Sequence, residues 1–222
     1  MHGGGSEISS ALQDANRPTR FIDGIRVTEK QDIEIVENVL SEAVNGRIAA
    51  RLEQNNVPCA RMSGKTEHLL VAEPIRRQGH DYGFVGQIKK VNPGVISQAL
   101  QAGTVPVVSP ISADEENNSY NVNADSAASA LAVGAGCTDL VYFTDVPGVK
   151  SGEELLYSLT IPEAKQLIAE GIIRDGMVAK MESAFEALNG HVERVHITCW
   201  QGEKTLQNII YQKSQSGTTI HI

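Results

Sequence analysis

Aromatic residues, cysteines and long apolar runs are all scarce in this 222-residue chain. Aromatic side chains make up 5% of it, so the core is expected to rest on aliphatic residues. Cys59, Cys137 and Cys199 lie far apart and form no CxxC pair, which argues against a disulfide framework or a zinc site and fits a reduced compartment. We find no signal peptide and no apolar run near the roughly 20 residues that span a bilayer. These absences predict a cytoplasmic protein without membrane contact.

Basic residues are also scarce relative to acidic ones. Lys and Arg total 19 against 27 Asp and Glu, which gives a formal net charge of −8. No block of Lys or Arg offsets this excess, so nucleic acid is not expected as a partner. The length fits one continuous domain, with room for a small subdomain.

Segments of strand character alternate with helical segments along the chain, which predicts an α/β fold. Strands 57–62 and 69–72 are expected to form a hairpin around Ser63–Thr66. Gly64-Lys65-Thr66 resembles the end of a P-loop, but that motif needs glycine where Cys59 stands, so we reject it. Further strands are expected at 83–91, 105–109, 139–143, 195–198 and 218–222.

Helix signals also occur along the chain. Thr28 and Gln31 have the spacing of a capping box, and a second helix is expected after Asn45-Gly46. Further helices are expected to begin at Asn92, Thr160 (with Glu163 as its capping-box partner) and Gly176. The helix after Thr28 is expected to bury an apolar stripe of Ile33, Val36, Leu40 and Ala43.

The stretch from Tyr120 to Val133 passes from alternating polar residues into small helix formers. Asn123 is the expected N-cap, and Asp125 would occupy the first turn, where the helix dipole favours an anion. Capping alone could explain either residue. Asn121, Asn123 and Asp125 together, just before an alanine-rich helix, favour a ligand site.

Two further segments could bind anions. His2-Gly3-Gly4-Gly5 opens a helix with bare backbone N–H groups, although no strand precedes it to hold it in place, and it could equally be a cloning tail. Asp145 to Lys150 follows a strand, at the edge where α/β sheets bind ligands, but could be a simple turn. Lys180 lies near a helix N-terminus, where a facing phosphate would explain a cation; a solvated lysine is the alternative.

Several motifs together resemble the acetylglutamate kinases of the amino acid kinase family, in that family's order. Any one of these motifs alone would be weak, but the set is highly specific. The matching segments are His2–Gly5, Phe21–Thr28 (including Asp23), Gly83–Gly86, Asn121–Asp125, Thr144–Val149 and Asp175–Met177 with Lys180.

The resemblance implies a three-layer αβα sandwich around a largely parallel sheet, lacking the family's first strand. Residues 1–110 would form an incomplete acyl-substrate part and residues 111–222 the nucleotide part. The implied activity is transfer of a phosphoryl group from ATP, with Mg²⁺ held mainly by its phosphates and no metal site of the protein's own. The acceptor would be the γ-carboxylate of N-acetyl-L-glutamate, in arginine biosynthesis. A homodimer or higher homo-oligomer is also implied.

The family's site residues carry over to matching positions in this chain. Gly4 and Gly5 would hold the substrate through their N–H groups, and Arg26 and Asn121 would bind its carboxylate end. Lys180 would stabilise the transferring phosphoryl group, and Asp125 would orient the catalytic lysines. The nucleotide would be bound by Asp145, Val146, Pro147, Gly148, Val149, Lys150, Gly176, Met177 and Lys180.

The sequence also departs from the family pattern. The opening strand and a second lysine would lie upstream of Met1, so phosphoryl transfer by this chain alone is expected to be weak. An inactive truncated kinase, or a non-catalytic homologue that binds nucleotide or amino acid, is therefore the alternative hypothesis. Carbamate and aspartate kinases are disfavoured by the Asn121–Asp125 and Asp23–Thr28 segments.

Overall fold

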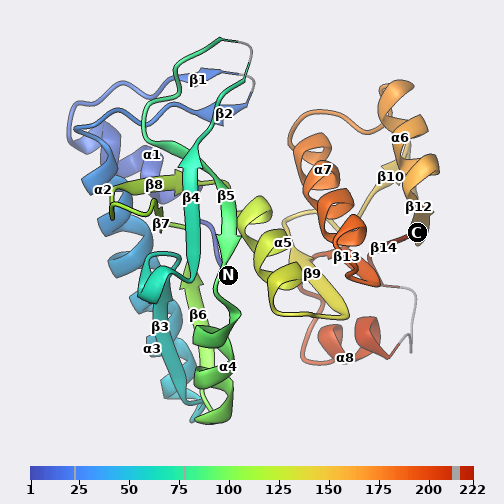
Figure 1. The fold of residues 1–222 in the computed structure, drawn as a ribbon. Helices are drawn as coiled ribbons and strands as arrows, with labels where there is room; N and C mark the ends of the chain where they lie inside the picture. Colours follow the sequence, from blue (N-terminus) through green and yellow to red (C-terminus); the bar gives the residue numbers. More distant parts are fainter. Residues whose placement is uncertain (23, 78, 212–215) are drawn as a thin grey trace. The chain divides into compact units, whose positions relative to one another are not determined.

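The computed structural model describes residues 1–22, 24–77, 79–211 and 216–222, so Asp23 of the matched Phe21–Thr28 segment lies outside the described residues. The chain forms two compact units, Met1–Ala135 and Gly136–Ile222 (Figure 1). The functional division expected at residue 110 concerns which ligand each part binds, and it stays a prediction.

Strands of the first unit form two main groups. β3 (Cys59–Ser63) pairs in parallel with β6 (Val105–Ser109). The second group closes on itself in the order β4, β5, β8, β7. Its members are β4 (Leu70–Pro74), β5 (Val85–Val91), β7 (Ser112–Ala113) and β8 (Ser119–Val122), and a separate short pair consists of β1 (Phe21–Ile22) and β2 (Ile25–Arg26).

The predicted hairpin between residues 57–62 and 69–72 is wrong. β3 pairs with β6, whereas β4 pairs with β5 and β7. The turn between them includes the short 3-10 helix η2 (Thr66–His68), where Glu67 and His68 have positive φ. This turn sends the chain into the other group of strands instead of back along β3.

One long helical segment covers residues 33–54: α2 (Ile33–Glu37), the π-helix η1 (Asn38–Val44) and α3 (Asn45–Gln54). The expected break at Asn45-Gly46 is absent. A π turn holds more residues than an α turn, so the buried stripe shifts and Val44 is buried while Ala43 is exposed. The helix begins after Asp32, without a side-chain cap, so the expected capping box at Thr28 is also wrong.

The remaining helices of this unit are α1 (Gly5–Asp14), α4 (Pro93–Gln101) and α5 (Ala124–Gly134). Figure 1 shows α2 and α3 on one side of the strands and α4 and α5 on the other. Aliphatic residues dominate the core between them, as the scarcity of aromatics predicts. A central cluster contains Leu69, Leu70, Ala72, Val95, Ile96, Val108, Tyr120, Val122 and Ala127.

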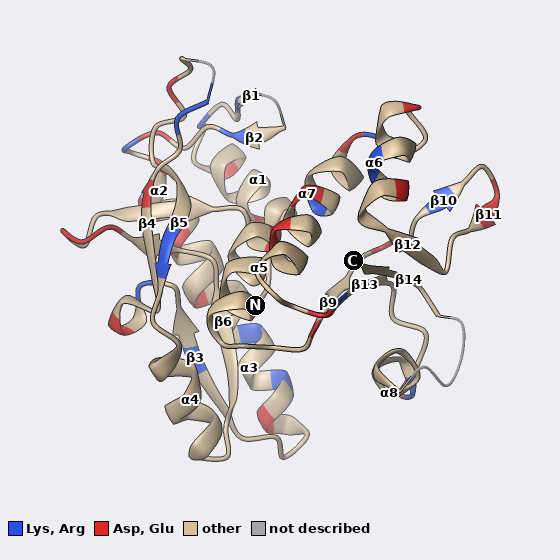
Figure 2. Ribbon diagram, turned by 45° about the vertical axis from the view of Figure 1, so that its right-hand side comes forward, with Lys and Arg blue, Asp and Glu red and all other residues tan. Residues whose placement is uncertain are grey.

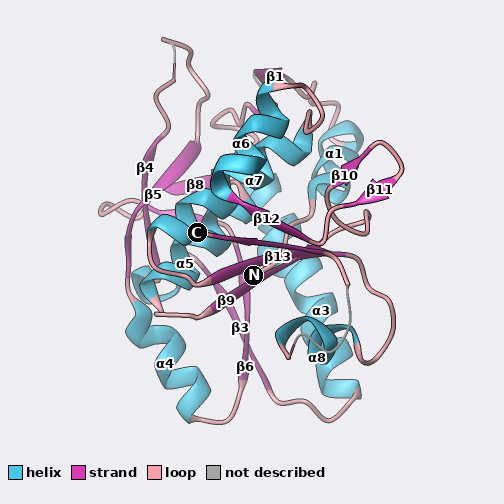
Figure 3. Cartoon of the chain, turned by 90° about the vertical axis from the view of Figure 1, so that its right-hand side faces the viewer, coloured by secondary structure: helices cyan, strands magenta, loops and turns pink. Residues whose placement is uncertain are grey.

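The second unit has a four-stranded sheet in the order β12, β14, β13, β9. β9 lies parallel to β13 and β12 parallel to β14, but β13 and β14 are antiparallel. Figures 1 and 3 show α6 and α7 on one side of this sheet and α8 on the other. The bounds are β9 (Asp139–Phe143), β10 (Lys150–Ser151), β11 (Glu154–Leu155), β12 (Ser158–Thr160), α6 (Ile161–Ala169), α7 (Gly176–Asn189), β13 (Arg194–Thr198), α8 (Thr205–Ile210) and β14 (Thr218–His221).

These arrangements confirm the predicted α/β class, with helices on both sides of the strands. Strands in both units pair in parallel and in antiparallel directions, so the sheets are more mixed than expected. The Thr160–Glu163 capping box is confirmed. Figure 2 shows acidic and basic residues interspersed along both units. Among the described residues, no helix is long and apolar enough to span a bilayer.

Candidate functional site

The glycine loop is tied to the strands of the first unit, contrary to the expectation that nothing would hold it. The main-chain N–H of His2 donates to Val108 O of β6 over 3.1 Å. A Cβ on Gly4 would lie 2.8 Å from Leu40 Cδ2 and 3.2 Å from Val44 Cγ2. Only glycine allows the loop to approach the helix this closely, so the loop rests on both β6 and η1.

Arg26 lies against the first turn of α1, directly after this loop. Its guanidinium donates to Gly5 O over 3.1 Å and to Ser9 Oγ over 2.8 Å, and it lies 4.8 Å from the centre of the Phe21 ring. Partial burial lowers the pKa of Arg26. A partly desolvated guanidinium beside a helix N-terminus is suited to binding a carboxylate.

Asn121 is linked to the segment after Arg26 through Phe84, the residue before β5. Its main-chain N–H donates to Phe84 O over 2.8 Å, and the N–H of Phe84 donates to Thr28 O over 2.7 Å. In addition, the Asn121 side chain donates directly to the Thr28 hydroxyl over 3.1 Å. Thr28 is buried, so it fixes the orientation of the Asn121 amide.

The N-terminus of α5 lies next to Asn121 and beside the glycine loop. Asn123 caps the helix, as predicted, by accepting from the N–H groups of Asp125 and Ser126 over 2.9 and 3.1 Å. A Cβ on Gly3 would lie 3.6 Å from Ala124 Cβ, so the glycine loop touches the start of α5. The first unit thus brings together two helix N-termini, Arg26 and Asn121.

The second group of predicted residues gathers in the other unit, after β9. Gly148 has φ 151°, and a Cβ there would meet Thr218 Oγ1 at 2.7 Å and Leu155 Cδ1 at 2.9 Å. The Thr218 hydroxyl accepts from the N–H of Val149 over 2.8 Å and donates to Leu156 O over 2.6 Å. The 145–150 loop is therefore closely packed against the start of β14, and glycine is required at 148.

Lys180 extends from α7 towards β9. Its ammonium lies 4.8 Å from the centre of the Tyr142 ring, and Tyr142 is close to the carboxyl end of β9, where the 145–150 loop begins. Gly176 opens α7, and a Cβ on it would meet no atom of another segment within 4 Å, so the helix start is open. This unit thus brings together a loop, a helix N-terminus and a cation.

A model of the amino acid kinase family matches residues 1–199 of the chain. The chain belongs to the amino acid kinase family. Two curated relatives named acetylglutamate kinase are similar to it along most of its length. The protein from Bacillus licheniformis is 40% identical over 202 residues, which is 91% of this chain and 78% of the relative. The protein from Geobacillus kaustophilus is 38% identical over 221 residues, or 99% and 83% of the two chains.

Solved structures give the same family fold for this amino acid kinase. The smu.665 protein of Streptococcus mutans matches with a TM-score of 0.85 and 28% identity, over 99% of this chain and 84% of that one. An N-acetylglutamate synthase from Neisseria gonorrhoeae, solved with coenzyme A and N-acetyl-glutamate, matches with a TM-score of 0.84 and 25% identity. That match covers all (100%) of this chain and 51% of the synthase.

The residues expected at the site of this amino acid kinase divide between its two units. Gly4, Gly5, Arg26, Asn121 and Asp125 belong to the first unit. The expected nucleotide residues and Lys180 belong to the second, so the orientation of Lys180 by Asp125 stays a prediction.

Sequence reasoning missed two supporting residues, Thr28 and Thr218. The local pattern assigns Thr28 to a helix cap, although its place in the matched Phe21–Thr28 segment could have indicated a role near the ligand. Thr218 carries no local signal, because its partners at 149 and 156 are more than 60 residues away. Within the described part of the chain, no group of three or more His, Cys, Asp or Glu residues could hold a metal ion.

Proposed function

We propose that this protein is an N-acetyl-L-glutamate kinase, which transfers the γ-phosphoryl group of ATP to the γ-carboxylate of N-acetylglutamate in arginine biosynthesis. The observation that carries the proposal is the 40% identity to an acetylglutamate kinase over 91% of the chain. The gathering of Arg26, Asn121 and the glycine loop at the start of α5 supports it.

The first unit would bind the amino acid substrate. N–H groups in the first turn of a helix have no partner within that helix, so those of Gly4 and Gly5 can donate to substrate oxygens. Arg26 would bind the carboxylate end, together with the Asn121 amide that Thr28 orients. A charged carboxylate on Arg26 adds charge-assisted hydrogen bonds, which are stronger than neutral ones.

The second unit would bind ATP. The 145–150 loop and the start of α7, at Gly176 and Met177, would contact the nucleotide, and Lys180 would offset negative charge on the transferring group. Phosphoryl transfer needs positioning and charge neutralisation more than a protein nucleophile. Mg²⁺ would be held mainly by the phosphates, and Asp125 would orient the lysines of the complete site. The protein would act as a homo-oligomer in the cytoplasm.

The test traps acyl phosphate as a hydroxamate and measures each ligand separately by calorimetry, with residues 1–222. We expect binding heat and a low yield of product with N-acetylglutamate, but neither with glutamate or aspartate. Arg26→Ala should weaken N-acetylglutamate binding by about 10- to 100-fold, because a hydrogen-bonded charge is lost. Lys180→Ala should lower the rate by about 10²–10³-fold while acyl substrate binding is kept.

Matched controls exist for both variants. Arg20→Ala removes an exposed cation from the same segment as Arg26. Lys165→Ala removes a lysine whose ammonium lies 5.7 Å from the centre of the Phe185 ring, a contact of the same kind as that between Lys180 and Tyr142. Both controls should behave as the unmodified protein. Binding of Mg-ATP without any response to N-acetylglutamate would reject the substrate assignment, and binding of both ligands without turnover would favour the non-catalytic alternative.

A further inference from the structure

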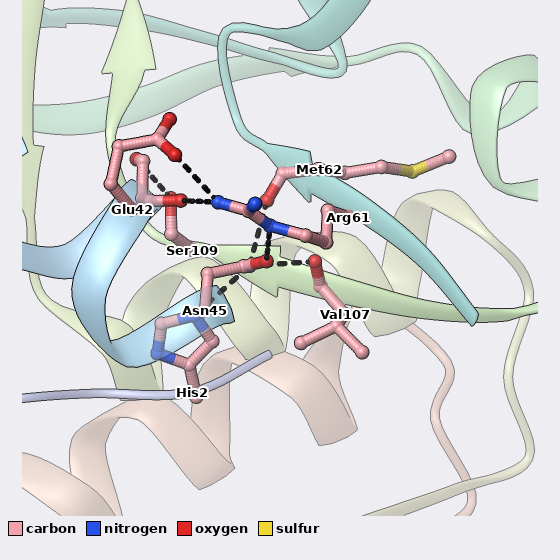
Figure 4. A network of polar contacts seen from close by, with 8 residues as sticks. His2, Glu42, Asn45, Arg61, Met62, Val107 and Ser109 are labelled. Atoms are coloured by element: carbon pink, nitrogen blue, oxygen red, sulfur yellow. Dashed lines mark hydrogen bonds and ion pairs between the residues drawn. The ribbon is translucent and has the colours of Figure 1, made fainter. Parts of the chain in front are cut away.

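A buried asparagine connects the glycine loop to the strands and to the helical segment below it. Asn45 is the first residue of α3 and is 0% exposed. Its amide nitrogen donates to Val107 O over 2.8 Å and to Met62 O over 3.1 Å, which are carbonyls of the paired strands β6 and β3 (Figure 4). Asn45 thus fixes the end of η1 onto both strands.

The same amide nitrogen lies 3.2 Å from His2 Nε2. The other ring nitrogen, Nδ1, lies 3.0 Å from Gly3 O. A carbonyl can only accept, so Nδ1 carries the proton and donates to Gly3 O, which leaves Nε2 as an acceptor. The Asn45 amide nitrogen has two protons for three acceptors, so one N–H is shared between Met62 O and His2 Nε2, the two longer contacts. His2 therefore bridges Asn45 and the first glycine of the loop as a neutral ring with a defined tautomer.

Arg61 and Ser109 hold Asn45 and its helix from the other side. Arg61 Nε donates to Asn45 Oδ1 over 3.4 Å, and its Nη2 donates to Ser41 O over 3.0 Å and to Glu42 over 2.7 Å. The hydroxyls of Ser41 and Ser109 lie 2.7 Å apart. These contacts come from β3, β6 and η1, so Asn45 has little freedom to move away from His2.

We propose that His2 and Asn45 are positioning residues, which hold the Gly3–Gly5 loop in the orientation that presents its N–H groups to the acyl substrate. Two links act together: the His2 main chain is bonded to β6, and its ring is bonded between Asn45 and Gly3. Glycine lacks a side chain that could restrain the loop. The restraint must therefore come from residues outside the glycines, and His2 supplies part of it from the preceding position. The role in substrate binding rests on the proposed function.

The direct test of this arrangement is nuclear magnetic resonance of the full chain. The ¹⁵N shifts of the His2 ring should show a neutral imidazole protonated at Nδ1. His2→Phe keeps a flat ring but removes both ring hydrogen bonds, and it should raise amide hydrogen exchange of Gly3–Gly5 by about tenfold. His80→Phe, at an exposed position in the same unit, is the matched control and should leave these amides unchanged.

The functional readout is a separation of kinetic constants. In His2→Phe the KM for N-acetylglutamate should rise by roughly 3- to 10-fold, as for one lost hydrogen bond, while the KM for ATP stays the same. His2→Gln, whose amide can replace one of the two ring contacts, should recover part of the loss. Asn45→Asp should shift the His2 ring signals, because it removes the donor that Nε2 accepts from.

Two failures can be told apart. If the unmodified chain neither binds nor phosphorylates N-acetylglutamate, the proposed function fails, and the exchange and tautomer measurements still decide whether His2 and Asn45 restrain the loop. If His2 is protonated at Nε2, or if His2→Phe leaves both glycine exchange and the KM for N-acetylglutamate unchanged, the positioning role is rejected.

Discussion

Asn123 shows how much one residue can reveal from its local context. Its capping role depends on the N–H groups two and three positions further along, and the sequence predicts it correctly. Asn45 gives no comparable signal, because its acceptors belong to residues 17 and 62 positions away. A polar residue whose partners are distant in the sequence cannot be told from a surface residue until the fold is known.

Asp125 occupies the first turn of the helix that Asn123 caps, which separates its expected effects on folding and on activity. Asp125→Asn keeps the shape of the side chain and removes its charge at the helix N-terminus. We expect the free energy of unfolding to fall by no more than about 1 kcal/mol, the usual size of a charge–dipole contribution at a helix N-terminus. Activity, measured in the hydroxamate assay, should fall by orders of magnitude.

Asn123→Ala is the comparison variant for this prediction. It should cost about 1 kcal/mol by loss of the cap, measured by urea denaturation. Near-normal turnover in Asp125→Asn would reduce Asp125 to a structural residue of the first turn.

At the scale of elements, local pattern is a good guide to where helices and strands begin, but not to which strands pair. The Thr160–Glu163 box and the start of α7 are predictable from residues within one turn. The pairing of β3 with β6 joins segments about 45 residues apart, and no local signal favours it over a hairpin with β4. Strand pairing is decided by long-range packing, which one sequence does not display.

The π-helix η1 explains the largest error in a helix prediction. The apolar pattern assumes 3.6 residues per turn from Ile33 onward, which places Ala43 in the core. Because η1 winds more loosely, Val44 is buried at 3% exposure and its Cγ2 lies under Gly4. The irregular segment thus faces the glycine loop and positions Asn45 directly after it.

Substitutions at residues 43 and 44 test this register. Val44→Ala should lower the free energy of unfolding by about 2 kcal/mol, because it removes buried methyl groups beside the glycine loop. Ala43→Ser should change it by less than about 0.5 kcal/mol, as is usual at exposed positions. Urea denaturation of the two variants provides the measurement. A larger loss at Ala43 than at Val44 would mean that an ordinary α-helix continues through this segment in solution.

For the whole molecule, family membership is predictable because short motifs keep their order along the chain. The resemblance also predicts separate substrate and nucleotide parts divided at residue 110, and that division stays a prediction. The motifs that resemble the family's substrate and nucleotide segments fall in separate compact units, and among the described residues no sheet is shared between the two. Composition carries no information on this point. The separation does suggest that ligand binding to each unit can be measured by itself.

A partly buried histidine in the first unit and a buried one in the second make stability depend on pH. His196 is buried between Asp139 Oδ1 and Thr219 Oγ1, each 3.0 Å from a ring nitrogen, and His2 lies under the glycine loop. Burial lowers the pKa of both rings below the ordinary value of 6.5. For Asp139, burial opposes ionisation, but hydrogen bonds from Arg194 and His196 outweigh it and lower its pKa.

The sign follows from proton binding. Below pH 6.5 the unfolded chain protonates these histidines before the folded chain does, so protons favour unfolding and stability falls as the pH falls. Carboxylates with lowered pKa values, including Glu7 at about 2, continue the loss below pH 4.5. Each proton taken up only on unfolding changes stability by at most about 1.4 kcal/mol per pH unit.

We therefore expect urea denaturation to give a lower free energy of unfolding at pH 5.5 than at pH 7.5. Replacing a histidine that is buried in its neutral form should remove its contribution to the change in unfolding free energy between pH 5.5 and pH 7.5. His196→Gln keeps a donor towards Asp139 and has no titrating group, so its curve should be flatter, even if the variant is less stable at pH 7.5. His191→Gln, at an exposed position of the same unit, should keep the original slope. Stability that rises on acidification from pH 7.5 to 5.5 would mean that His196 is held in its charged form by Asp139, against the effect of its burial.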